Sequence, residues 1–317
     1  MFQFSEGANP VLVIGVWLVV LVALMVANEL TRKYKWVGFF TFFILPVILT
    51  ALWFTVLRDT LYIGWFHMVK VYTATITCIG FWLIRHNKKL SVSKFALFFP
   101  PAILAINIMQ AVVRDFELGI NYGGLGPIFN EGAGAIIIAG PWNIMNGIAG
   151  ILNIIAITGF AGIILRKVTD KDKSKSILWP DMLWFYIIAY NLWNFAYVYN
   201  AIPHRSWYNG LALLIAPTII AFTTGKGSWV QHRGHTLAVW VFFALTFPAF
   251  LDESIWRVDS VYNPTIQFAV SLAALLSNVA IVGYMIYKWK ATGRNPYKAE
   301  VYTDLKGYQA IKAMGEK

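Results

Sequence analysis

Residues 10–30, PVLVIGVWLVVLVALMVANEL, are apolar over almost their whole length and are followed at once by Arg32, Lys33 and Lys35. A membrane-spanning helix needs about 20 such residues, and basic residues directly after a span favour the cytoplasmic side. The only charged side chain before the stretch is Glu6, so the basic segment that starts a cleaved signal peptide is missing. The stretch therefore predicts an uncleaved transmembrane helix that enters from outside.

The composition of the rest of the chain agrees with this prediction. Of the 317 residues, 58% are hydrophobic and 13% are charged, whereas a soluble domain has about 25% charged residues. The single cysteine, Cys78, excludes an intramolecular disulfide and a C-x-x-C metal or redox site. We expect an all-α polytopic membrane protein.

The basic residues predict how the chain crosses the membrane. If the loop after the first span is cytoplasmic, 21 of the 26 Lys and Arg residues fall in inner segments, four in outer segments, and Lys70 within a span. This alternation follows the positive-inside rule for nine spans, with the N-terminus outside and the C-terminus in the cytoplasm. The net charge of +11 is thus a topology signal and does not indicate nucleic acid binding. The predicted spans are 10–30, 37–57, 61–84, 95–114, 142–165, 179–200, 208–224, 236–252 and 264–288.

The sequence divides into a transmembrane domain, residues 1–291, and a cytoplasmic tail, residues 292–317. Tyr302, Leu305, Tyr308 and Ile311 recur in the tail at helical spacing. This spacing is typical of a short amphipathic helix on the inner membrane surface. A basic tail that only fixes the topology is the alternative.

The outer connection 117–141 is long and rich in glycine, and it contains the segment GAGAIIIAG, which is too short to span a membrane. Irregular backbone survives at membrane depth only where protein or water covers it. The connection is therefore either a re-entrant lid that carries Glu131 or an ordinary surface loop.

Polar and small side chains recur at helical spacing on five of the predicted spans. Residues three, four and seven apart share one helix face, so each set forms a polar stripe. Such stripes form hydrogen bonds between packed helices or line a cavity that holds water and a solute, and the sequence leaves both open. They comprise His67, Lys70, Ala74 and Thr77 or Cys78 on the third span; Asn107, Gln110 and Arg114 on the fourth; Asn143, Asn146, Gly147, Gly150 and Asn153 on the fifth; Tyr186, Tyr190, Asn194 and Tyr197, with Asn191 beside them, on the sixth; and Gln267, Ser271, Ala274 and Asn278 on the ninth.

Lys70 favours the cavity. It lies about nine residues inside its predicted span, roughly 14 Å deep at 1.5 Å per residue, in a hydrocarbon core about 30 Å thick. A lysine there costs about 2.5–3.5 kcal/mol unless it is paired or hydrated. We expect it to form the charged floor of an outward-facing pocket, with His67 one turn above. A buried ion pair with Glu131, Asp115 or the pair Asp252–Glu253 is the alternative.

These residues predict a transporter, channel or uptake facilitator for a small polar or anionic solute. Lys70, His67 and Arg114 would supply charge, and Glu131 or His67 would carry a coupled proton, since histidine titrates near neutral pH. The expected partners are membrane lipids and the solute, with no nucleic acid, and a homo-oligomer is compatible with the sequence. The candidate solute-binding residues are Lys70, His67, Arg114, Asn107, Gln110, Asn143, Asn146, Asn191, Asn194 and Glu131.

Two other functions are compatible with the sequence. A membrane-embedded enzyme acting on a lipid or lipid-linked substrate would use Glu131, His204, Asp252 or Glu253 of the predicted outer face as acid–base groups. A receptor or assembly subunit would have a packed polar seam and no solute path. The chain contains no P-loop, G-x-G-x-x-G, H-E-x-x-H or C-x-x-C-H motif, so we expect no cofactor, and an enzyme is the less favoured class. His232 and His235 in QHRGH are interpreted as polar residues at the cytoplasmic boundary, so no metal site is expected.

Three long stretches carry a resemblance to a known family: WPDMLWFYIIAYNLWNFAYVYN (179–200), GPWNIMNGIAGILNI (140–154) and RNPYKAEVYTDLKGYQ (294–309). They resemble an uncharacterised bacterial family of multi-span membrane proteins, one of the families defined by a domain of unknown function. The resemblance covers nearly the whole chain and implies a protein of the bacterial cytoplasmic (inner) membrane. It implies no substrate, activity or site residues.

Overall fold

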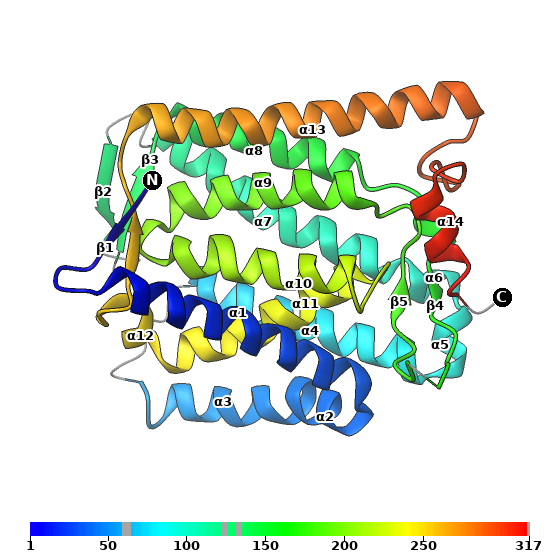
Figure 1. The fold of residues 1–317 in the computed structure, drawn as a ribbon, viewed down its shortest axis with the longest axis horizontal. Coiled ribbons are helices and arrows are strands. Elements are labelled where there is room, and N and C mark those ends of the chain that lie inside the picture. The colour runs from blue at the N-terminus through cyan, green and yellow to red at the C-terminus, as the bar shows by residue number, and fades with distance from the viewer. Residues whose placement is uncertain (59–64, 122–125, 131–134, 171, 316–317) are drawn as a thin grey trace.

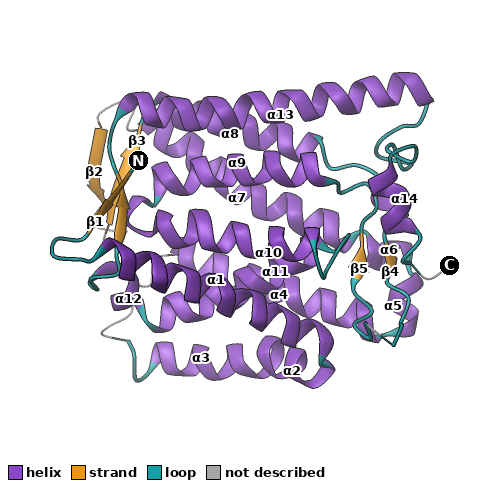
Figure 2. Cartoon of the chain, viewed as in Figure 1, coloured by secondary structure: helices purple, strands orange, loops and turns teal. Residues whose placement is uncertain are grey.

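The protein is a bundle of helices that run along one common axis, with short strands at both ends (Figures 1 and 2). The structure is a computed structural model and describes residues 1–58, 65–121, 126–130, 135–170 and 172–315. We call the end of the bundle that carries the N-terminus and strands β1 to β3 the N-end. The opposite end, which carries α14 and strands β4 and β5, is the C-end (Figure 1).

The first long helix of the chain and the last one each begin at a proline that follows an N-capping asparagine. In α1 (Pro10–Lys33) the Asn9 side chain accepts a hydrogen bond from the Val11 N–H at 2.9 Å, and Asn263 caps α13 (Pro264–Thr292) in the same way. Proline suits a first helical turn because its missing N–H would have no partner there. The other α-helices are α2 (Lys35–Phe39), α3 (Leu45–Phe54), α4 (Trp65–His86), α5 (Lys88–Val92), α6 (Lys94–Leu97), α7 (Phe99–Asn121), α8 (Pro141–Ile155), α9 (Trp184–Ala201), α10 (Leu213–Phe222), α11 (Trp229–Thr246), α12 (Pro248–Asp252) and α14 (Lys306–Lys312).

Short strands and tight helical turns close the two ends. Strand β1 (Phe2–Phe4) pairs with β6 (Val258–Ser260) at the N-end, and β4 (Ile164–Leu165) pairs with β5 (Ile177–Leu178) at the C-end, both antiparallel. Within the described residues, the remaining helical turns are two π-helical segments, Phe40–Ile44 and Tyr208–Ala212, and two 3₁₀ turns, Phe160–Gly162 and Pro203–Arg205.

Five helical segments of the described chain are long and apolar enough to cross a membrane: Pro10–Lys33, Lys35–Phe54, His67–His86, Lys94–Asn121 and Pro264–Thr292. They correspond to the first four and the last of the predicted spans. Large apolar side chains on their outer faces stay exposed, as Val11 (76%) and Val19 (67%) do on α1. Such faces mark contact with lipid or protein and not with water. The length and composition of these helices indicate a membrane protein built mainly from α-helices.

The other four predicted spans form shorter or more polar helices, and several of their boundaries were wrong. The segment 179–200 starts too early, because α9 begins at Trp184, and the helix in the segment 236–252 ends at Thr246. The segment 142–165 stays helical only to Ile155, because the chain then turns toward the C-terminal tail: Gly159 has a φ of +59° and its N–H donates to the Pro296 carbonyl at 2.9 Å. The segment 236–252 starts too late, because α11 begins at Trp229. Residues assigned to a cytoplasmic loop therefore lie inside a helix.

The described part of the connection 117–141 is the end of α7 followed by an antiparallel hairpin at the N-end. Strand β2 (Gly126–Asn130) pairs with β3 (Ala135–Ala139), with Gly126 opposite Ala139. Ile137, Ile138 and Ala139 are buried, and β3 contacts α9 and the turn Pro203–Arg205. Glu131 lies outside the described residues.

The C-terminal tail packs on the C-end of the bundle. Tyr302, Tyr308 and Ile311 are buried in a cluster with Leu178 and Leu183, and Leu305 packs against the same cluster. The side chain of Asp181 accepts hydrogen bonds from the backbone N–H groups of Val301 at 2.8 Å and Tyr302 at 3.3 Å. The apolar residues of the tail thus contact protein.

Candidate functional site

Four of the residues selected from sequence line one cavity inside the bundle. His67 and Lys70 reach it from α4, Asn107 from α7 and Asn194 from α9. The cavity has a volume of about 110 Å³, which is enough for roughly four water molecules at about 30 Å³ each or for a small solute. We call it the central cavity.

The wall of the central cavity is built by five helices and by the turn that follows α9. Helices α9 and α11 each pack against several other helices. Their inward faces therefore meet the polar faces of α4 and α7 in the middle of the bundle. The remaining lining residues are Tyr190, Tyr197 and Val198 of α9; Ile202, Arg205 and Asn209 after it; Leu213 of α10; and Arg233, Leu237, Trp240, Val241, Ala244 and Leu245 of α11.

The charge of this wall is positive. Lys70, Arg205 and Arg233 line the cavity, and no Asp or Glu of the described chain does. Arg205 pairs with Asp252, which lies behind it, through Nε at 2.9 Å and through Nη2. The potential inside such a lining favours anions.

Arg233 has no hydrogen-bond partner for its buried donors. Its residue surface is only 7% exposed, and Nε and Nη1 are buried with no acceptor among the described residues. The guanidinium carbon lies 6.0 Å from the centre of the Tyr190 ring. A buried guanidinium left in this way costs free energy, so the cavity presents unused donors to whatever enters it.

Other cavity groups also lack partners. The Tyr197 hydroxyl and the side-chain carbonyl of Asn107 are buried and have no hydrogen-bond partner among the described residues. The Asn107 backbone carbonyl accepts a hydrogen bond from Lys70 Nζ at 3.2 Å. Buried polar groups are nearly always satisfied by protein or ordered water, so donors and acceptors gathered at one cavity indicate a place for water or a solute.

A smaller cavity of about 30 Å³ continues from the central cavity past Arg233. Both cavities are lined by Asn107, Tyr190, Arg233 and Leu237. The smaller one reaches Thr77 and Phe81 of α4 and Gly234 of α11. Arg233 therefore lies at the junction of two cavities.

Five predicted site residues lie outside the lining of the central cavity, and three of them contact neighbouring side chains. Arg114 forms an ion pair with Glu117 at 2.6 Å on its own helix. Gln110 donates to the Thr73 hydroxyl at 3.2 Å, and Asn191 donates to the Thr218 hydroxyl at 2.8 Å. These contacts hold α7 against α4 and α9 against α10.

Asn143 and Asn146 bind a carboxylate of the protein. Asp115 is fully buried and accepts one hydrogen bond from Asn143 at 3.0 Å and one from Asn146 at 2.7 Å. The two amides follow each other at i, i+3 on α8, so they face α7 together. Two acids predicted as partners of Lys70, Asp115 and Asp252, are thus engaged elsewhere.

The remaining polar stripes form a hydrogen-bonded seam between α8, α9 and α13. Asn153 donates to Asn278 at 2.7 Å and accepts from the Tyr186 hydroxyl at 2.9 Å. Asn200 donates to Ser271 at 3.3 Å, nearer the N-end of the same seam. The molecule therefore contains both arrangements that the stripes allowed: a packed seam on one side of α9 and a cavity on the other.

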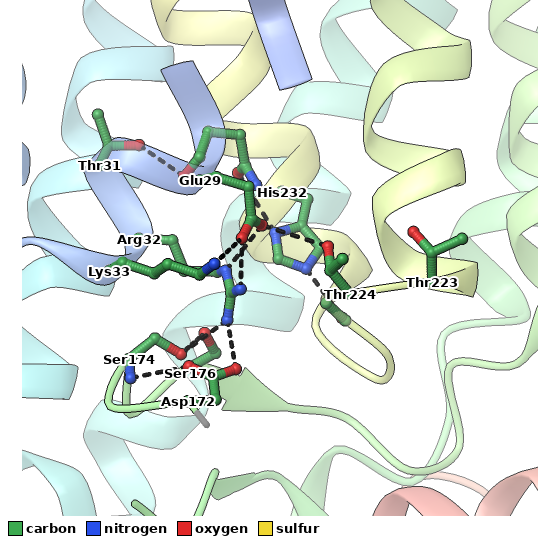
Figure 3. Close-up of polar contacts among 12 residues, drawn as sticks. Glu29, Thr31, Arg32, Lys33, Asp172, Ser174, Ser176, Thr223, Thr224 and His232 are labelled. Atoms are coloured by element: carbon green, nitrogen blue, oxygen red, sulfur yellow. Dashed lines mark hydrogen bonds and ion pairs between the residues drawn. The ribbon is translucent and has the colours of Figure 1, made fainter. Parts of the chain in front are cut away.

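A second cluster of charged residues lies near the C-end, and here the groups are paired (Figure 3). Arg32 donates to Glu29 through Nε at 3.0 Å and Nη2 at 2.7 Å, and through Nη1 to Asp172 at 2.7 Å and Ser174 at 2.8 Å. Burial acts to raise the pKa of Asp172, but hydrogen bonds from Arg32 and Ser174 outweigh it and lower the pKa to about 2. We call this group the Arg32 cluster.

His232 and His235 are buried helix residues, so their interpretation as polar loop residues was wrong. Nε2 of His232 lies 2.9 Å from the Gly225 carbonyl, and its Nδ1 lies 3.3 Å from Asn28 Oδ1 (Figure 3). Nδ1 of His235 lies 3.2 Å from the Thr31 hydroxyl. These contacts join α11 to α1, and the described residues contain no group of three His, Cys, Asp or Glu side chains suited to a metal ion.

Two of the groups considered for acid–base chemistry, His204 and Asp252, lie close together at the turn Pro203–Arg205. His204 Nε2 lies 3.5 Å from Asp252 Oδ1, and burial together with the charge of Arg205 lowers the pKa of His204 to about 4. The Ser206 hydroxyl donates to the Pro203 carbonyl at 2.8 Å. His204 is therefore neutral near pH 7, and Ser206 is bound to backbone instead of to a base.

Sequence reasoning missed Arg233 and Arg205. Arg233 was counted as a loop charge, although Arg233, Leu237, Trp240 and Ala244 follow one another at intervals of three and four residues and share one helix face. That spacing was the available signal. Arg205 follows a helix end, and nothing in its local sequence indicates that it faces a cavity.

The comparisons with known proteins agree with the resemblance to an uncharacterised family. The family of unknown function DUF5692 matches residues 7–314, so the chain belongs to this family. Neither a curated protein nor a solved structure matches the chain.

Proposed function

We propose that this member of DUF5692 is a transporter, channel or uptake facilitator that moves a small polar or anionic solute through the central cavity. One observation carries the proposal: the buried Arg233 guanidinium has no acceptor for Nε and Nη1 in a cavity that Lys70 also lines and no described acid lines. An anion would supply the acceptors and the opposite charge at once. Hydrogen bonds to charged groups are worth about 1.5–3 kcal/mol each.

The smaller cavity supports movement through the bundle in addition to binding. It begins at Arg233 and leads toward Phe81 and Gly234. A Cβ atom added at Gly234 would lie 3.1 Å from both the Phe81 ring and the Thr77 side chain, so the cavity is narrow there. We propose that the solute passes Arg233 and that this constriction is the inner gate.

We further propose nine spans in the bacterial cytoplasmic membrane, with the N-end outside. The end of α1 with the start of α2, the segment between α4 and α7, and the segment between β4 and β5 carry clusters of Lys and Arg, and they lie at the C-end (Figure 1). Cytoplasmic loops are enriched in these residues. The central cavity reaches Arg205 in the N-end connection after α9, so in this orientation it faces outward, beside the hairpin β2–β3.

The test is anion binding by purified protein in detergent, measured as thermal stabilisation over a panel of small anions. A ligand that binds only the native state stabilises it by RT ln(1 + [L]/Kd) and so raises the unfolding temperature. Arg233→Gln should weaken binding by about 10- to 100-fold, since it removes one charge-assisted contact.

Arg114→Gln is the matched control, because Arg114 pairs with Glu117 away from the cavity. It should bind like the unmodified protein. Equal stabilisation of Arg233→Gln and Arg114→Gln by every anion would overturn the proposal. Flux of the binding anion into proteoliposomes, lost in Arg233→Gln, then separates a carrier or channel from a receptor.

A further inference from the structure

The charged and apolar parts of the central cavity are separated along α11. The lining residues of this helix are Arg233, Leu237, Trp240, Val241, Ala244 and Leu245, and their spacing places them on one face. The face begins with a cation and continues with apolar side chains from Leu237 to Leu245, eight residues or about 12 Å at 1.5 Å per residue. The other lining guanidinium, that of Arg205, is paired with Asp252, so a solute on this face would meet a charge without a described partner at the Arg233 end.

The lining residues of the other helices show the same separation into a charged part and an apolar part. Asn107 and Tyr190 line the small cavity together with Arg233, and Lys70 is hydrogen-bonded to Asn107, so these groups surround the Arg233 end. Val198 and Ile202 of the α9 side, and Leu213 of α10, face the apolar part of α11 across the cavity. The indole N–H of Trp240 is already bound to Asn209 at 2.5 Å, so it offers no free donor there.

We infer that the solute is a short aliphatic carboxylate, whose carboxylate lies at Arg233 and whose hydrocarbon part lies against the apolar wall formed by Leu237 to Leu245. This inference rests on the proposed function and names its solute class. An inorganic anion would leave the apolar wall in contact with water. A fully polar metabolite would lose hydrogen bonds to water along that wall without replacement, which costs free energy.

The volume of the cavity limits the length of the solute. About 110 Å³ accommodates roughly four water molecules at about 30 Å³ each, and therefore a solute of about five or six non-hydrogen atoms. This corresponds to a chain of three or four carbons that includes its carboxylate. A long-chain fatty acid or a phospholipid shares the headgroup chemistry but does not fit inside.

The experiment is a titration of purified protein with acetate, butyrate, hexanoate, octanoate and dodecanoate, each compared with chloride and with the alcohol of equal length. Burying one methylene group strengthens binding about fourfold. Affinity should therefore rise about fourfold per carbon up to butyrate and then stop rising. The alcohols should bind more weakly, and Arg233→Gln should remove the difference between acid and alcohol.

Val241→Thr provides the second variant, because it keeps the shape of a side chain on the apolar wall and adds a hydroxyl. It should leave acetate affinity unchanged and reduce the gain from acetate to butyrate. Equal affinity for chloride, acetate and butyrate would overturn the carboxylate inference and leave anion binding intact. A rise that continues to dodecanoate would assign the site to a lipid anion instead. No binding of any anion would refute the proposed function itself.

Discussion

Arg32 and Arg233 are both buried arginines of this bundle, and their N–H groups have opposite surroundings. Arg32 is 2% exposed and gives four hydrogen bonds to Glu29, Asp172 and Ser174. Arg233 is 7% exposed, and its buried Nε and Nη1 meet no acceptor among the described residues. The same side chain thus completes a network near one end of the molecule and lines a cavity in the middle.

The difference shows how a structural charge can be distinguished from a binding charge. Burying a charge away from water costs free energy. The folded protein recovers that cost only when it places hydrogen-bonding or oppositely charged partners around the charge. The Arg32 cluster has them, and it ties α1 to the segment that carries Asp172. Arg233 lacks them, so its cost is recovered when water or a solute enters.

The first prediction breaks the Arg32 cluster. Arg32→Met should destabilise the protein by about 3–5 kcal/mol, because it leaves Glu29 and Asp172 without their buried partner. Unfolding in detergent, followed by tryptophan fluorescence, measures the loss. Lys33→Gln is the control: Lys33 contacts the same Glu29 at 3.0 Å, but its side chain is 45% exposed, and an exposed pair is worth about 0–1 kcal/mol. Similar losses for both variants would contradict this view of the cluster.

The second prediction asks whether paired charges near the N-end are structural as well. Asp115→Ala leaves the buried amides of Asn143 and Asn146 without their acceptor, and each orphaned group costs about 1–3 kcal/mol. We expect a loss of stability with retained anion affinity in the folded fraction. Asp115→Asn keeps one acceptor and should lose less. Normal stability with altered anion affinity in Asp115→Ala would show that Asp115 belongs to the binding site and not to the structural framework.

The sequence predicts the long apolar helices well because lipid imposes one requirement on them. A run of about 20 apolar residues is needed whatever it packs against, and five predicted spans have counterparts that are long and apolar enough to cross a membrane. The segment 142–165 fails at Ile155 for a reason that lies far away in the chain. Its continuation meets the tail at Pro296, and no local pattern contains that contact.

The polar residues were predicted less well, because an amide that packs helices and an amide that lines a cavity look alike in sequence. Asn107 and Asn194 line the cavity, whereas Asn143 and Asn146 bind Asp115. The pairing of Arg114 could have been predicted from the sequence, because Glu117 follows at i+3, where opposite charges pair on a helix surface. The place of Arg233 in the cavity wall was missed, because its helix was not recognised as starting at Trp229.

The third prediction is the counterpart of the first. Arg233→Met replaces a buried charge without built-in partners by an apolar side chain of similar length. Stability should stay the same or rise by about 1–2 kcal/mol, while anion binding is lost. The same unfolding measurement applies to both arginine variants. A loss as large as that of Arg32→Met would show that Arg233 is structural and would remove the contrast between the two residues.

The fourth prediction tests whether water reaches the central cavity. Lys70→Cys in a Cys78→Ser background should react with a membrane-impermeant thiol reagent added from the N-end side. Lys70 lines the cavity, whereas Cys78 is fully buried, so the unmodified protein is the control and should stay unlabelled. Labelling of Lys70→Cys only after denaturation would mean that the cavity is closed to solvent, and the solute path would have to be sought elsewhere.

The last and smallest effect concerns pH at the C-end, where two aspartates should act in opposite directions. Burial raises the pKa of Asp181 from 3.8 to about 6, although hydrogen bonds from Val301 and Tyr302 oppose the change. Between about pH 4 and pH 6 the folded protein therefore keeps a proton that the unfolded chain has lost, and the contribution of Asp181 to stability falls as the pH rises.

For Asp172 the folded pKa of about 2 lies below its ordinary value of 3.8, so its contribution is present above pH 4 and is lost as the pH falls toward 2. Unfolding of the full chain at a series of pH values tests both groups. Asp181→Asn should flatten the profile between pH 4 and 6, and Asp172→Asn should flatten it between pH 2 and 4. If Asp181→Asn leaves the upper slope unchanged, the carboxyl that holds the tail is ionised in the folded protein throughout this range, and the backbone N–H groups of Val301 and Tyr302 donate to a carboxylate anion.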